Sequence, residues 1–138
     1  MNEEIERLFV NTYIQKQFRE RLIFELKDIS SKTPKRSFRA FAKLSHAAGD
    51  YLIPRLIALS GSHLTGQDVL SFVEKMVRGK SCYYMDDFGG EEMPLNEAVD
   101  RAFNDPGASI IVYQDIFAVL KEETFIGAPC KYILVNQR

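Results

Sequence analysis

Apolar residues in the first thirty positions recur three and four residues apart, which places them along one side of a helix. One set runs from Ile5 to Ile14, and a second runs from Phe18 to Ile29. No glycine or proline occurs before Pro34. The pattern therefore predicts a helical N-terminal region and leaves open whether it is one long kinked helix or two helices.

Ser30–Pro34 has the composition of a loop, because three hydroxyl side chains and a proline compete with helical hydrogen bonding. A further helix is predicted to start at Pro34, with Thr33 as its cap, and to end at Gly49. Tyr51–Leu59 is ambiguous, since Pro54 suits the first turn of a short helix or an edge strand.

The clearest helix signal follows Thr65. Thr65 and Asp68 have the spacing of a capping box, with Asp in place of the usual Glu or Gln. An apolar stripe then continues to Val77, and Gly79 offers a stop. We expect a helix over this whole stretch.

After Gly79 the pattern changes to short strands. Cys82–Met85 is rich in strand-favouring residues, and an acidic turn is predicted over Asp86–Glu92, before Pro94 opens another helix. Short polar links separate three more apolar runs, which favours antiparallel neighbours because parallel crossovers need a dozen or more residues. These runs are Ile110–Tyr113, Phe117–Leu120 and Tyr132–Val135.

The predicted fold class is α+β, with N-terminal helices packed on a small, mostly antiparallel C-terminal sheet that contains one inserted helix. The 138 residues, 46% of them hydrophobic, provide enough apolar surface for one core. We therefore expect a single domain over residues 1–138, helical up to about residue 79 and sheet-containing from about residue 80.

Several classes of protein are disfavoured. No apolar stretch approaches the roughly 20 residues that span a bilayer, and Met1–Glu4 lacks the basic and then apolar pattern of a secretory signal. We therefore expect a cytoplasmic protein. Cys82 and Cys130 lie far apart without a neighbouring histidine, so we expect buried thiols rather than a zinc or redox site. No cofactor or metal is indicated.

The charge is distributed unevenly along the chain. Residues 16–43 contain nine Lys or Arg against three acidic residues, whereas Asp86–Asp105 contains seven acidic residues and only Arg101. The formal net charge is -1. This separation of charge narrows the choice of partners, because a charged region attracts a partner surface of opposite charge and steers its association.

The candidate basic site comprises Lys32, Lys35, Arg36 and Arg39. Basic side chains interleaved with phenylalanines are typical of nucleic-acid binding, through phosphate neutralisation and base stacking. The phenylalanines here share the spacing of a helical core face, and the overall charge is slightly negative. Three interpretations of this segment therefore remain: solvated helix faces, a surface for an acidic protein partner, and a nucleic-acid-binding surface.

The candidate acidic site comprises Asp86, Asp87, Glu91 and Glu92. Their spacing does not match a calcium loop, which needs oxygen ligands at alternating positions and a glutamate at the twelfth. The plainer interpretation is a solvated turn whose carboxylates interact favourably with the N-terminus of the following helix. Contact with a partner, or with the basic region of the same chain, is the alternative.

The two histidines are candidates for acid–base chemistry. His46 and Asp50 lie four residues apart and would share a helical face if the helix continued through Gly49. No nucleophile is indicated beside His46 or His63, and the chain lacks Gly-x-Gly-x-x-Gly, His-Glu-x-x-His and Gly-x-Ser-x-Gly.

The leading functional hypothesis is a non-enzymatic binding protein that meets a protein partner through its charged surfaces, of inhibitor or immunity type by analogy. Nucleic-acid binding through residues 32–43 is the first alternative, and a small hydrolase or transferase that uses His46 or His63 is the second. We also expect that Tyr132–Val135, as an exposed final strand, can pair edge to edge in a homodimer.

Overall fold

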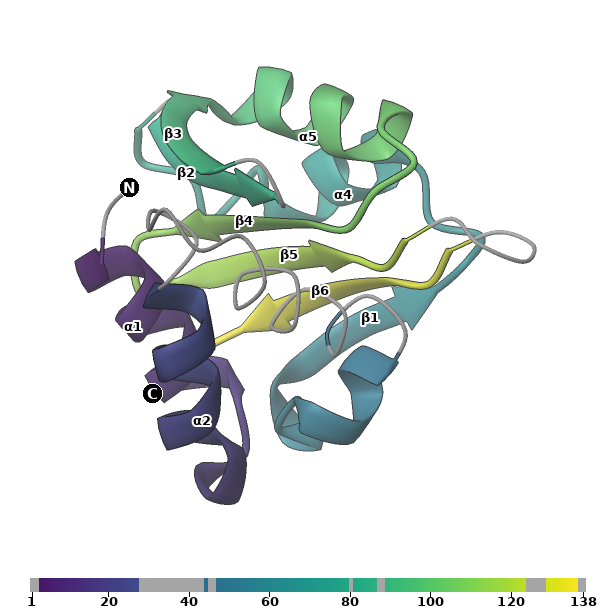
Figure 1. Ribbon diagram of the computed structural model, residues 1–138. Coiled ribbons are helices and arrows are strands. Elements are labelled where there is room, and N and C mark those ends of the chain that lie inside the picture. The colour runs from purple at the N-terminus through teal and green to yellow at the C-terminus, as the bar shows by residue number, and fades with distance from the viewer. Residues whose placement is uncertain are drawn as a thin grey trace.

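The fold is a six-stranded antiparallel sheet between helices, so the predicted α+β class is confirmed. The computed structural model describes residues 3–27, 44, 47–79, 81–86, 89–123 and 129–136 (Figure 1). The strand order is β1-β6-β5-β4-β2-β3. The strands are β1 (Ile57–Gly61), β2 (Ser81–Asp86), β3 (Gly89–Pro94), β4 (Ser109–Tyr113), β5 (Phe117–Lys121) and β6 (Lys131–Val135). The helices are α1 (Glu3–Tyr13), α2 (Lys16–Lys27), the 3₁₀ turn η2 (Pro54–Leu56), α4 (Gly66–Val73) and α5 (Leu95–Asn104).

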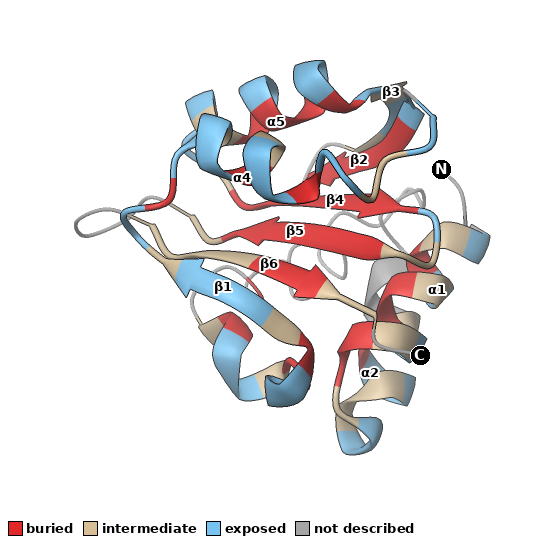
Figure 2. Ribbon diagram, turned by 180° about the vertical axis from the view of Figure 1, so that it is seen from behind, coloured by how far each residue is buried: buried red, intermediate tan, exposed pale blue. Residues whose placement is uncertain are grey.

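Both faces of the sheet are covered, because successive strand side chains point to opposite sides and both sides are apolar. On β4, Ile110 belongs to a core shared with Phe9 of α1, while Ile111 belongs to a second core shared with Val99 of α5. Figure 2 shows that β4 and β5 are buried along their whole length, whereas the outer sides of α4 and α5 are exposed. The central strands therefore lie between two helical layers.

The N-terminal region forms two helices, and a long-range contact separates them. Ile14 makes an isolated bridge with Leu52. The Gln15 backbone N–H donates to the carbonyl of Tyr51 at 2.8 Å, and the Gln15 side chain donates to the carbonyl of Asp50 at 3.1 Å. Since these partners lie more than thirty residues away, no local pattern could have predicted the break.

The following segment is described only in part. The loop at Ser30–Pro34 and the predicted helix start lie outside the described residues. Residues 47–51 are helical, so the predicted stop at Gly49 is wrong. The segment around Pro54 contains both predicted elements, one after the other. A 3₁₀ turn begins at Pro54 and leads directly into β1, an edge strand of the sheet.

The capping box at Thr65 is confirmed. The Asp68 N–H donates to the Thr65 hydroxyl at 3.1 Å, and the Thr65 N–H donates to the Asp68 carboxylate at 2.9 Å. The helix is shorter than predicted, ending at Val73 instead of continuing to Val77. Beyond it, the backbone N–H groups of Arg78 and Gly79 both donate to the hydroxyl of Tyr113 on β4.

The predicted acidic turn is wrong for most of its length, because Asp86 ends β2 and Glu91 and Glu92 lie on β3. Glycine, glutamate and proline have low strand propensity, so this strand depends on its pairing with β2 over six residue pairs. The Tyr83 side chain lies so close to the backbone of β3 that a Cβ at Gly90 would collide with its hydroxyl, so this position needs glycine.

The predicted position of the last strand is wrong. β6, which contains Tyr132–Val135, lies between β1 and β5, and the edges of the sheet are β1 and β3. β1 comes from the segment that Pro54 made ambiguous, so the strand that covers β6 was not recognisable from local sequence. Edge-to-edge pairing through Tyr132–Val135 is therefore excluded in this fold.

The Thr65 cap provides a test of local stability. Thr65→Ala removes the acceptor for the Asp68 N–H, and we expect the free energy of unfolding to fall by about 1 kcal/mol. Urea denaturation monitored by circular dichroism measures it. Ser71→Ala, on the exposed side of the same helix, is the control and should change stability by less than about 0.5 kcal/mol. An equal loss in the two variants would contradict the capping role.

Candidate functional site

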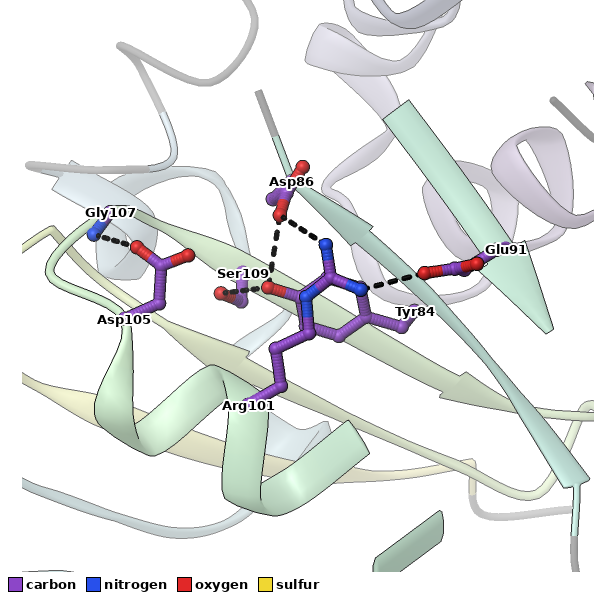
Figure 3. A network of polar contacts seen from close by, with 7 residues as sticks. All are labelled: Tyr84, Asp86, Glu91, Arg101, Asp105, Gly107 and Ser109. Carbon is purple, nitrogen blue, oxygen red and sulfur yellow. Dashed lines mark hydrogen bonds and ion pairs between the residues drawn. The ribbon is translucent and has the colours of Figure 1, made fainter. Parts of the chain in front are cut away.

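A network of polar side chains lies at the end of β2, beneath α5 (Figure 3). The Tyr84 hydroxyl donates to Asp86 Oδ2 at 3.0 Å and lies 3.2 Å from Ser109 Oγ. Because the single phenolic proton is committed to the carboxylate, Ser109 is the donor in the second bond. Arg101 donates to Glu91 Oε1 at 2.6 Å, and its Nη2 lies 3.9 Å from Asp86 Oδ2.

Strand register explains why these residues meet. Tyr84 and Asp86 are two apart on β2 and therefore point to the same face, the one that α5 covers. Asp86 lies opposite Ser109 on β4, and Tyr84 lies opposite Glu91 on β3. Arg101 reaches down from α5, with its guanidinium 4.8 Å from the centre of the Tyr84 ring, within cation–π range.

The electrostatics of the network favour a neutral phenol and a charged guanidinium. Burial raises the pKa of Tyr84 to about 12, with a further upward contribution from the Asp86 carboxylate and an opposing one from Ser109. The hydrogen bond to Glu91 is the main cause that raises the pKa of Arg101. Within the network, Tyr84 is therefore held as a neutral phenol and Arg101 as a charged guanidinium near neutral pH.

Ser109 is unsuited to nucleophilic catalysis despite its position opposite Lys121 on β5. Ser109 is 1% exposed, and its hydroxyl is bonded to Tyr84. Lys121 is 2% exposed and donates to the carbonyls of Asp105 and Gly107, both at 2.6 Å. Burial lowers the pKa of Lys121, but these two bonds give it a structural role at the connection between α5 and β4.

The acidic residues predicted from the sequence are separated by the fold. Asp86 is 5% exposed and bonded inside the network, while Asp87 lies outside the described residues. Glu91 is exposed and faces Arg101, so it does not cap the α5 N-terminus, where Glu97 is the acidic residue of the first turn. Glu92 is exposed and lies opposite Tyr83, on the other face of the sheet.

The exposed part of this region forms what we call the acidic edge. It consists of two glutamates on β3 and two acidic residues on α5, with Arg101 as the basic residue among them. Its acidic members are Glu91, Glu92, Glu97 and Asp100. The sequence missed the α5 contribution, although the helical spacing of Glu97 and Asp100 on the side opposite the apolar stripe was a signal that could have found it.

The remaining candidates from the sequence are the four basic residues and the two histidines. Lys32, Lys35, Arg36, Arg39 and His46 all lie outside the described residues. His63 is exposed in the turn after β1, close to Gly61, and lines none of the three cavities described for this structure. The structure therefore gives no enclosed site for acid–base chemistry at His63.

Two of these cavities flank β3, one on each face of the sheet. The first, which we call the Arg101 cavity, has a volume of about 200 Å³ and is lined by Tyr84, Asp86, Gly89, Gly90, Glu91 and Arg101. The second, the Glu92 cavity, has a volume of about 270 Å³ and is lined by Ile5, Leu8, Ser81, Cys82, Tyr83, Glu92, Val112 and Gln114. Each cavity thus contains one glutamate of the acidic edge.

The described part of the chain contains no set of side chains arranged as a metal site or as a disulfide. No cluster of three or more His, Cys, Asp or Glu in those residues is placed to hold a metal ion. Both cysteines are free, and burial raises the pKa of the Cys82 thiol to about 12, whereas Cys130 is half-buried. None of the helices among the described residues has the length and apolarity needed to cross a bilayer.

Comparison of the chain with protein-family models, with curated proteins and with solved structures found no match.

Because the Tyr84 hydroxyl is buried, we expect the free energy of unfolding to decrease at alkaline pH. The unfolded phenol titrates at about 10, whereas the folded one titrates at about 12. A raised folded-state pKa contributes stability that is complete below pH 10 and falls as the pH rises toward 12. We expect the unfolding free energy of the wild type, measured in urea, to fall more steeply across this range than that of Tyr84→Phe. Equal slopes for the two proteins would contradict the assignment.

Lys121→Met tests the structural role of the buried ammonium group. The substitution keeps the apolar stem but leaves the carbonyls of Asp105 and Gly107 without their donor. We expect unfolding to become easier by about 2–3 kcal/mol, measured by urea denaturation. Lys75→Met, at an exposed position, is the matched control and should be nearly neutral. Unchanged stability of the Lys121 variant would rule the role out.

Proposed function

We propose that this protein is a non-enzymatic binding module whose acidic edge binds a basic surface of another protein. The observation that supports the proposal is the presence of four exposed acidic residues on an edge strand and the helix next to it, Glu91, Glu92, Glu97 and Asp100, with Arg101 as the basic residue of these two elements. Four carboxylates and one guanidinium leave this edge with a formal charge of -3.

The packing of α5 supports binding through its outer side. Leu95, Ala98, Val99 and Ala102 are buried against the sheet, so the helix is held rigidly and its charged side faces solvent. A rigid surface loses little conformational entropy when a partner docks. The exposed carboxylates attract a basic partner and steer it toward the edge.

Catalysis is the weaker explanation of this region. The hydroxyls of Tyr84 and Ser109 are bonded to each other, and Asp86 is occupied by Tyr84. Nucleic-acid binding is also disfavoured at the acidic edge, since phosphates would be repelled there. The basic segment that suggested nucleic acid, residues 32–43, lies outside the described residues, so that alternative stays a prediction of the sequence.

The experiment compares two double variants that each remove two negative charges. Glu97→Gln with Asp100→Asn neutralises the α5 half of the acidic edge and leaves the Arg101–Glu91 bond intact. Glu20→Gln with Glu74→Gln neutralises exposed residues on α2 and just beyond α4. Partners are captured from cell extract with the wild type, identified, purified and titrated calorimetrically at low and high salt.

We expect a basic partner whose affinity falls with salt and falls about tenfold for the α5 pair. The affinity for the control pair should change by less than about twofold. A purified partner that binds the α5 variant as tightly as the wild type, or that loses equal affinity with the control pair, would contradict the proposal.

A further inference from the structure

We propose that the partner docks by adding an extended, basic segment to the outer edge of β3 as a further strand of the sheet. This inference rests on the proposed function and specifies how the acidic edge is recognised. Strand addition of this kind takes its affinity from main-chain hydrogen bonds and its specificity from the sites that alternate side chains enter.

The geometry of β3 suits the addition of a strand. It is the outermost strand at its end of the sheet, and it pairs in continuous register with β2 from Gly89 opposite Asp86 to Pro94 opposite Ser81. Among the described residues, no strand pairs with its outer side. Gly89 and Gly90 carry no side chains that could obstruct an approaching backbone. The N–H and C=O groups on the outer side of the strand are thus arranged to accept another strand.

The two glutamates of β3 point to opposite faces of the sheet. Glu91 lies opposite Tyr84 and points to the face covered by α5, whereas Glu92 lies opposite Tyr83 and points to the face of α1. Successive side chains of an added strand also alternate between these two faces. Adjacent basic residues of the incoming segment would each meet one of the two glutamates.

A cavity on each side of β3 could receive a side chain of the added strand. The Arg101 cavity contains the carboxylate of Glu91, whose side chain is 61% exposed and whose Oε1 accepts from Arg101 at 2.6 Å. The Glu92 cavity has apolar walls formed by Ile5, Leu8 and Val112 with a carboxylate at Glu92. This combination suits lysine or arginine, whose aliphatic stem packs on apolar surface while the charged end pairs.

The same charges select a partner over a second copy of this chain. Two β3 strands paired edge to edge would bring glutamates close to glutamates, which is destabilising. The opposite edge of the sheet, β1, contains no charged residue and has an irregular register between Ile57 and Leu59. A basic segment therefore finds complementary charge at β3 and none at β1.

The test uses two synthetic peptides of equal charge. One alternates lysine with threonine, and the other has the same sequence with N-methyl groups on every second amide, which removes hydrogen-bond donors from one edge of the peptide. Each is titrated calorimetrically into the wild-type protein. Amide hydrogen exchange of β3 is followed by NMR, with the exchange of β1 as the internal control.

We expect the unmethylated peptide to bind about tenfold more tightly than the methylated one, because the latter loses main-chain bonds. It should also slow amide exchange in β3 and leave β1 unchanged. Glu92→Gln, which preserves the Arg101–Glu91 bond, should weaken the unmethylated peptide more than Glu74→Gln does. Thermal unfolding of both variants verifies that they are folded.

The other outcomes separate this inference from the function on which it rests. If both peptides bind equally and β3 exchange is unchanged, strand addition is overturned, whereas charge-based binding at the acidic edge survives. If neither peptide binds, an extended basic segment is overturned as the ligand, and the calorimetry with the captured partner decides the proposed function on its own.

Discussion

The burial of β4 and β5 on both faces is the constraint on which the rest of the structure depends. Every residue of these two strands is buried, so each polar group that they bring into the interior needs a partner inside the protein. That need is concentrated at one end of the sheet, where Asp86, Ser109 and Lys121 stand in register across three neighbouring strands. Tyr84 and the carbonyls after α5 supply the partners.

This constraint divides the acidic residues into an internal and an external set. Asp86 accepts a hydrogen bond inside the network, and Arg101 links that network to Glu91 at the surface. The remaining acidic residues of β3 and α5 are then held at fixed positions by a buried apolar helix face and a regular strand pairing. The acidic edge is therefore rigid, and a rigid surface with exposed carboxylates suits recognition of a basic partner.

Local sequence predicted the elements whose stabilisation is itself local. The capping box at Thr65, the helix after Pro94 and the three apolar runs of the C-terminal half all appear where their patterns placed them. Elements that depend on distant partners were predicted poorly. β3 has few strand-forming residues and exists through its pairing with β2, and the break between α1 and α2 arises from contact with Leu52.

The sequence by itself determined the α+β class, the amphipathic helices and the abundance of acidic residues between Asp86 and Asp105, because periodicity and composition are properties of neighbouring residues. Only the tertiary structure decided that β6 is internal, that Asp86 is buried and that Glu91 and Glu92 point to opposite faces of an edge strand. Strand order and register arise from which surfaces bury one another, and a shift of one residue would turn every side chain to the other face.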